Sequence, residues 1–153
     1  MVERRSVAVF VFRAREPRFL LLRRIPSRGG FWQPVTGRVE DTDHVTYAPR
    51  GDPAEMQGLM ACAAREVREE TGLKDLLAVI DLGLESRFEG YDGNTYCERA
   101  FAAEVPVDAE VLPSDEHDDV RWVGYEDALQ LLRWDENREA LRRLVAIIDG
   151  RAA

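Results

Sequence analysis

The sequence contains few of the residues that usually bind transition metals or form disulfides. Its 153 residues include two cysteines, Cys62 and Cys97, and two histidines, His44 and His117. The spacing of these residues matches no zinc-binding pattern. Two cysteines in a chain of this size are more typical of reduced core residues than of a disulfide. We therefore expect neither a zinc site nor a scaffold that depends on a disulfide.

The sequence also lacks long apolar runs and an export signal. No stretch approaches the roughly 18 apolar residues of a membrane span. The N-terminal residues Met-Val-Glu-Arg-Arg precede a short apolar run without a signal-peptide cleavage pattern. We therefore expect a cytoplasmic protein with no membrane partner. Apolar residues make up 45% and charged residues 33%, which suits one soluble domain over residues 1–153.

Common catalytic motifs are missing as well. The sequence has no Gly-x-Ser-x-Gly, no His-Glu-x-x-His and no glycine-rich loop of the kind that cradles phosphates, so a side-chain nucleophile is not indicated. Acidic residues outnumber basic ones by 29 to 21, for a net charge of −8. Such a charge disfavours general nucleic-acid binding. It would also repel a polyphosphate substrate unless cations neutralise the site.

Apolar patterning predicts an α/β protein. Strands are predicted at 6–12, 19–22, 76–86, 95–105 and 120–123, the first two forming a hairpin. Helices are predicted at 57–70, 125–134 and 136–149, with Gly72 ending the first. Loops are predicted at 26–30, 31–37 and 41–56, because glycines and prolines, including Pro49 and Pro53, interrupt these segments. Leu59, Cys62, Ala63 and Val67 form the predicted buried stripe of the first helix.

The helix over 57–70 carries a cluster of carboxylates. At about 100° per residue, Glu66, Glu69 and Glu70 fall within an arc of about 100° on one face. Such a cluster is unfavourable without cations, and its hard oxygen ligands favour Mg²⁺ or Mn²⁺. We expect the carboxylates of Glu69 and Glu70 to face metal and solvent rather than the core. The alternative is a solvated face whose glutamates pair with Arg65 and Arg68.

The segment Arg-Glu-Val-Arg-Glu-Glu-Thr-Gly-Leu at 65–73 resembles the second half of the Nudix box. Gly37, followed by Val39-Glu40, resembles the opening glycine of that box. The pattern would place its arginine at position 51 rather than 65, so this chain carries about fourteen extra residues between glycine and helix. The first glutamate of the pattern falls at Gln57, and that role stays unassigned, with Glu55 and Asp43 as nearby carboxylates.

This resemblance implies a Nudix-like α/β/α sandwich with a mixed β-sheet between helices. It implies that Glu66, Glu69 and Glu70 bind Mg²⁺ or Mn²⁺, joined by the backbone carbonyl of Gly37. Arg65 would orient a glutamate through a bidentate pair. Glu116 matches a family position that supplies a further carboxylate and is the better candidate for general base, although it could instead be a solvated loop acid.

A more extended resemblance concerns the substrate. The chain also resembles the family branch that contains dihydroneopterin triphosphate pyrophosphatase, which also cleaves dATP. This similarity lies in segments 31–40, 114–117, 121–123 and 134–138. It implies hydrolysis of a nucleoside triphosphate or dihydroneopterin triphosphate to the monophosphate and pyrophosphate by a metal-activated water. Arg23 and Arg24 are candidate phosphate ligands. Trp32 is either a stacking surface for a base or pterin, or a core residue.

Other functions stay open at this point. Within the enzyme class, the alternative substrates are dinucleoside polyphosphates and oxidised nucleotides. A non-catalytic nucleotide-sensing module of the same family is a further alternative, and a purely structural role would leave the carboxylate cluster unexplained. The expected partner is a small polyphosphate, and a second copy of the chain is a candidate partner. We expect residues 41–56 to form a surface loop near the cleft mouth that tunes substrate choice.

Overall fold

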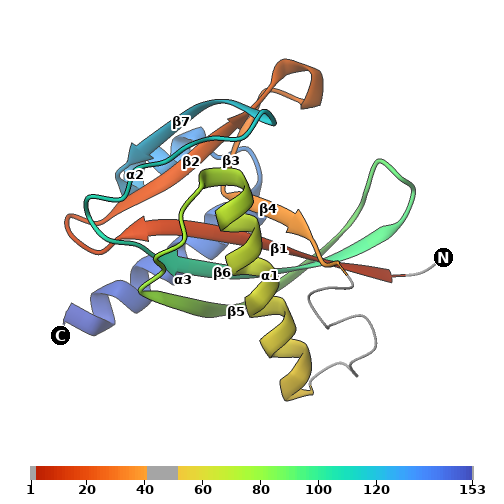
Figure 1. Cartoon of the computed structure of the whole chain (residues 1–153), viewed down its shortest axis with the longest axis horizontal. Coiled ribbons are helices and arrows are strands. Elements are labelled where there is room, and N and C mark those ends of the chain that lie inside the picture. Colours follow the sequence, from red (N-terminus) through yellow and green to blue (C-terminus); the bar gives the residue numbers. More distant parts are fainter. Residues whose placement is uncertain (1–2, 41–51, 153) are drawn as a thin grey trace.

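Strand β1 (Glu3–Arg13) lies at the centre of a mixed sheet in the computed structural model, which describes residues 3–40 and 52–152 (Figure 1). The side chains from Val7 to Phe12 are all buried, because helices cover both faces of the sheet. Along its length β1 pairs in parallel with β6 (Thr95–Glu104). On its other side it pairs antiparallel with β4 (Val35–Arg38) and then with β2 (Arg18–Arg24).

The remaining strands extend the sheet on both sides. β5 (Ala78–Glu89) pairs antiparallel with β6, and β3 (Trp32–Gln33) and β7 (His117–Val123) both pair antiparallel with β2. The strand order is β3-β2-β1-β6-β5, with β4 joined to β1 and β7 joined to β2. The predicted hairpin of the first two strands is confirmed, with Phe12 opposite Phe19.

Two apolar cores hold the helices to opposite faces of the sheet (Figure 1). Helix α1 (Pro53–Thr71) packs on one face through the predicted stripe of Leu59, Cys62, Ala63 and Val67, all at most 2% exposed. Helices α2 (Tyr125–Leu131) and α3 (Asp135–Ala152) pack on the other face, where Leu141 and Leu144 contact the Phe10 side of β1. The predicted α/β/α sandwich is therefore confirmed.

Three segments predicted as loops contain regular structure. Helix α1 begins at Pro53, so residues 53–56 are helical, because proline is well tolerated in the first turn and Asp52 caps the helix by accepting a hydrogen bond from Ala54 N at 2.8 Å. The rest of that predicted loop, residues 41–51, lies outside the described residues. The predicted loop at 31–37 contains β3 and most of β4, while the loop at 26–30 includes a 3₁₀ turn η1 (Pro26–Arg28).

Cys62 and Cys97 are buried and form no disulfide, as predicted. Among the helices of residues 3–40 and 52–152, none is long and apolar enough to cross a membrane.

Candidate functional site

The close approach of β4 to α1 requires a glycine at position 37. A Cβ atom built on Gly37 would lie 1.9 Å from Cδ of Glu66, so no side chain fits there. The carboxyl group of Glu66 therefore lies directly over the backbone of β4 and is largely buried. Two residues that are distant in the sequence, both predicted for the site, are brought into contact by this packing.

Arg65 connects α1 to β4 and orients two glutamates. Its Nη1 donates hydrogen bonds to Oε1 of Glu66 at 2.9 Å and to Oε2 of Glu69 at 3.1 Å. Its Nη2 donates to the backbone carbonyl of Arg38 at 3.0 Å. The predicted bidentate pair with one glutamate is thus replaced by a nitrogen shared between two glutamates, which holds both carboxylates near the end of β4.

Glu70 is the most deeply buried carboxylate of the cluster. Its side chain is 6% exposed, its Oε2 has no hydrogen-bond partner, and its Oε1 lies 3.7 Å from Nε2 of His117. Burial, together with the neighbouring carboxylate of Glu66, raises the pKa of Glu70 far above its usual range, and burial also raises the pKa of Glu66. The expectation that the Glu70 carboxylate faces solvent is wrong, because β4 and the β7 end of the sheet enclose it.

Glu116, in the loop that precedes β7, and His117, the first residue of β7, lie close to this cluster. The loop is fixed on both sides, since Ser114 N donates to the Glu70 carbonyl and Ile25 N donates to the Glu116 carbonyl, each at 3.2 Å. Glu116 is exposed, and its charge contributes to the raised pKa of Glu70. The predicted catalytic candidates Arg65, Glu69, Glu70 and Glu116 are therefore gathered at one end of the sheet.

Sequence reasoning missed His117 and Gln33. His117 is buried between Glu70 and Gln33, with Nε2 of His117 lying 3.5 Å from Nε2 of Gln33. Burial and the nearby Arg24 lower the pKa of His117, which favours the neutral imidazole. The one available signal was its position directly after Glu116, and the pairing of β7 with β2 that buries it is not visible in the sequence.

The carboxylate oxygens of this cluster are better suited to binding a divalent cation than to lying beside one another without one. In the described part of the chain, no three His, Cys, Asp or Glu side chains are already arranged around a metal position. Glu69 is half exposed and held by Arg65, whereas Glu66 and Glu70 are buried, and the charge of Glu66 adds to burial in raising the pKa of Glu70. A cation can relieve the same repulsion, and the unpartnered Oε2 of Glu70 is a hard oxygen donor of the kind that Mg²⁺ prefers.

Glu55 does not belong to this cluster. It lies eleven residues before Glu66 on α1, which corresponds to about 16 Å along the helix. It is buried in the first turn and forms an ion pair with Arg5 at 3.8 Å. Asp43, the other carboxylate considered for the first position of the box, lies outside the described residues.

The three predicted substrate-binding residues lie where β2 ends and β3 begins. Arg23 is engaged by Asp118, with Nε 2.7 Å from Oδ1. Arg24 has no acidic partner among the described residues, and its buried Nε has no hydrogen-bond partner. Trp32 packs against the core under α2 and α3, and the guanidinium groups of Arg23 and Arg121 lie 5.7 and 4.8 Å from its ring centre. Arg24 is therefore the arginine left available to an anion.

The fold and this constellation agree with a known family. Residues 2–144 match the family model described as NUDIX domain. The chain belongs to the NUDIX domain family.

Two curated relatives are longer than this chain. The chain is 39% identical over 144 residues to an octanoyltransferase of Myxococcus xanthus, with 92% of the chain and 36% of the relative covered. It is 26% identical over 113 residues to the mitochondrial Nudix hydrolase 13 of Arabidopsis thaliana, with 69% of the chain and 56% of the relative covered. The chain thus spans about a third and about half of the lengths of these relatives, and neither name describes this chain.

Solved structures share the fold over nearly the whole chain. A candidate NUDIX hydrolase from Listeria monocytogenes is similar at a TM-score of 0.70 and 26% identity, covering 95% of this chain and 94% of that one. The dihydroneopterin triphosphate pyrophosphohydrolase of E. coli is similar at a TM-score of 0.67 and 25% identity, covering 95% and 99%. The Ap4A hydrolase of C. elegans, at a TM-score of 0.71 and 22% identity with 96% and 98% covered, shares the fold.

Proposed function

We propose that this chain is a divalent-metal-dependent pyrophosphohydrolase. Its substrate would be a nucleoside triphosphate or dihydroneopterin triphosphate, cleaved to the monophosphate and pyrophosphate. The observation that carries the proposal is the buried pair Glu66 and Glu70 on the helix that bears the family motif, with Glu66 held over Gly37 and hydrogen-bonded to Arg65. Membership of the NUDIX domain family and the similarity to the E. coli pyrophosphohydrolase support it.

The residues proposed to hold Mg²⁺ or Mn²⁺ are Glu66, Glu69 and Glu70, with the carbonyl oxygen of Gly37 as a further donor. A divalent cation, when bound, supplies charge neutralisation at phosphate oxygens and activates water. Arg65 keeps Glu66 and Glu69 oriented toward β4. Because Arg65 and Glu69 meet at the surface, Glu69 can exchange this partner at little free-energy cost, since exposed ion pairs contribute about 0–1 kcal/mol.

Glu116 is the proposed general base. It would accept a proton from the water that attacks phosphorus, while a new P–O bond forms and the P–O bond to the leaving pyrophosphate breaks. Its position supports this role, because it is exposed to solvent yet close enough for its charge to act on Glu70. The hydrogen bond from Ser114 to the Glu70 carbonyl fixes the loop that carries it.

Arg24 is the proposed phosphate ligand at the end of β2. Its guanidinium group lies beside His117 and has no carboxylate partner in the described residues, so binding a phosphate would satisfy its orphaned donor. Arg23 would act mainly by supporting the wall formed with Trp32, because Asp118 already engages it. A base or pterin that stacks on Trp32 would have to share the ring with Arg23 and Arg121.

A substrate screen with Mg²⁺ tests this function. We would incubate the protein with dATP, an oxidised guanosine triphosphate, dihydroneopterin triphosphate and Ap4A, and separate the products. The expected products are pyrophosphate and the monophosphate from a triphosphate substrate. If Ap4A alone were hydrolysed, the proposed substrate class would change to dinucleoside polyphosphates. Ap4A hydrolysis is the activity that the name of the C. elegans neighbour gives. Binding without hydrolysis of any compound would contradict the enzyme assignment and favour a nucleotide sensor.

A further inference from the structure

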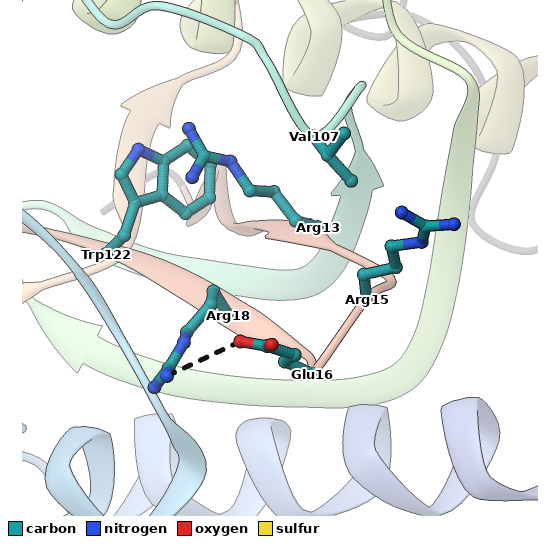
Figure 2. A pocket seen from close by; sticks show the side chains of 6 residues that line it. All are labelled: Arg13, Arg15, Glu16, Arg18, Val107 and Trp122. Atoms are coloured by element: carbon teal, nitrogen blue, oxygen red, sulfur yellow. Dashed lines mark ion pairs between the residues drawn. The ribbon is translucent and has the colours of Figure 1, made fainter.

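A basic hollow lies at the β1–β2 turn, away from the carboxylate cluster. It has a volume of about 350 Å³ and is lined by Arg13, Arg15, Glu16, Arg18, Val107 and Trp122 (Figure 2). Small-ligand sites are usually concave pockets of about 300–1,000 Å³, and this hollow is at the lower end of that range and wide open to solvent. The lining contains three arginines and one acid, which is the opposite balance from a chain with a net charge of −8.

Glu16, the single acid of the hollow, pairs with one of the three arginines and does not pair with the other two. Glu16 forms an ion pair with Arg18 at 3.7 Å, and Figure 2 shows this pair on one side of the turn, away from Arg13 and Trp122. Glu16 has a φ of 74°, a left-handed conformation that is strained for a residue with a side chain. In the described part of the chain, neither Arg13 nor Arg15 has a carboxylate partner.

Arg13 is held in place with an unused donor. Its guanidinium carbon lies 3.9 Å from the ring centre of Trp122, and its Nη2 donates to the carbonyl of Ala109 at 2.9 Å. Its Nε is buried and has no hydrogen-bond partner. Stacking on the Trp122 ring explains where the guanidinium group of Arg13 lies, but it provides no hydrogen-bond acceptor for Nε. An immobilised arginine also loses little conformational entropy when it binds an anion.

We propose that this hollow is a second anion site, which binds a phosphate-type oxyanion through Arg13 and Arg15. The planar donor forks of arginine match phosphate geometry, and Trp122 and Val107 provide an apolar wall. The oxyanion is either inorganic phosphate or the phosphate group of a nucleotide. The site is separate from the proposed catalytic one, because β2 runs six residue steps from Arg18 at the hollow to Arg24 beside His117, about 20 Å at about 3.3 Å per step.

An NMR titration in excess chelator tests this proposal without using catalysis. Inorganic phosphate and AMP would be added separately to the ¹⁵N-labelled protein while the amides of residues 13–16, 18 and 107–109 and the Trp122 indole are followed. We expect saturable shifts at these groups. Equal affinities for the two probes would identify free phosphate as the ligand chemistry, and tighter AMP binding would identify a nucleotide phosphate; both outcomes support the site.

Matched charge variants decide whether the arginines of the hollow are responsible. R15Q removes an exposed charge and should weaken binding about tenfold or more, the size expected when a charge-assisted hydrogen bond is lost, whereas R15K should bind more tightly than R15Q. R142Q removes an exposed arginine on α3 and should leave the affinity unchanged. Shifts that do not saturate, or an affinity that is the same in R15Q and wild type, would overturn the proposal.

Discussion

Gly37 determines how closely β4 approaches the carboxylates of α1. Because a Cβ atom at this position would lie 1.9 Å from Cδ of Glu66, Gly37→Ala forces Glu66 or β4 to move. We expect a loss of unfolding free energy of about 1–3 kcal/mol, as for other overpacked sites, together with weaker Mg²⁺ binding. Urea denaturation and calorimetric Mg²⁺ titration measure these two effects.

Gly150→Ala is the control for Gly37→Ala. Gly150 lies in α3 with no atom near its would-be Cβ, so alanine should leave stability unchanged or raise it by up to about 1 kcal/mol. If Gly37→Ala were as stable as Gly150→Ala and bound Mg²⁺ normally, the close approach of β4 and Glu66 would have no role in the site.

Glu69 and Glu70 should matter for rate rather than for folding. Glu69→Gln and Glu70→Gln should each lower kcat by about 10²–10³, the usual effect of losing one charge-stabilising group. Glu70→Gln should also keep or raise the stability of the metal-free protein, because it removes a buried carboxylate whose pKa is raised beside Glu66. Steady-state kinetics and thermal unfolding test both parts, with the exposed Glu139→Gln as the control. Near-normal kcat in both variants would refute the metal assignment.

Glu98 should make stability depend on pH. This strand residue faces Glu136 of α3, and burial with the added charge of Glu136 raises its pKa from 4.5 to about 7. Between these values the folded state binds more protons than the unfolded chain, so stability falls as pH rises. Glu98→Gln should therefore be more stable than wild type at pH 8, on the order of 1–3 kcal/mol, and similar to it near pH 4. A difference that is constant with pH would contradict this explanation.

Among the helices and strands, α1 shows which features the sequence pattern predicts correctly and which it does not predict. The helical repeat correctly predicted the buried stripe from Leu59 to Val67. It also placed Glu66, Glu69 and Glu70 on one side of the helix, but their separation into two buried residues and one exposed residue depends on β4 and on the loop before β7. Those contacts join segments far apart in the sequence, so the helix pattern alone could not contain them.

The start of α1 also defines where the chain can be shortened. Replacing residues 42–50 by a short linker should retain metal binding and some hydrolysis, provided that Asp52 and Pro53 keep the helix cap. Loop closure entropy changes by only about 0.6 kcal/mol per doubling of length, so stability should change little. We expect altered ratios of kcat/KM among substrates. Unchanged ratios of kcat/KM would indicate that the replaced residues do not affect substrate choice. Loss of metal binding in a folded variant would assign Asp43 as a ligand.

For the molecule as a whole, the sequence predicted the individual helices and strands better than the way in which they pair and pack. The apolar runs located the long strands and the three helices, and the nine-residue motif located the metal-binding candidates. The parallel pairing of β1 with β6 and the antiparallel pairing of β7 with β2 are long-range contacts that the local pattern does not encode. These pairings bring Glu116, His117 and Arg24 to the carboxylates, which explains why His117 and Gln33 escaped prediction.

The metal dependence of pyrophosphate release tests the proposed function of the carboxylate cluster. The wild-type protein would be assayed with the best substrate of the screen in Mg²⁺, in excess chelator, and after Mg²⁺ is restored. We predict that turnover is lost in chelator and recovered with Mg²⁺, because the buried Glu66 and Glu70 pair is proposed to act by holding the cation. Full turnover in excess chelator would contradict it.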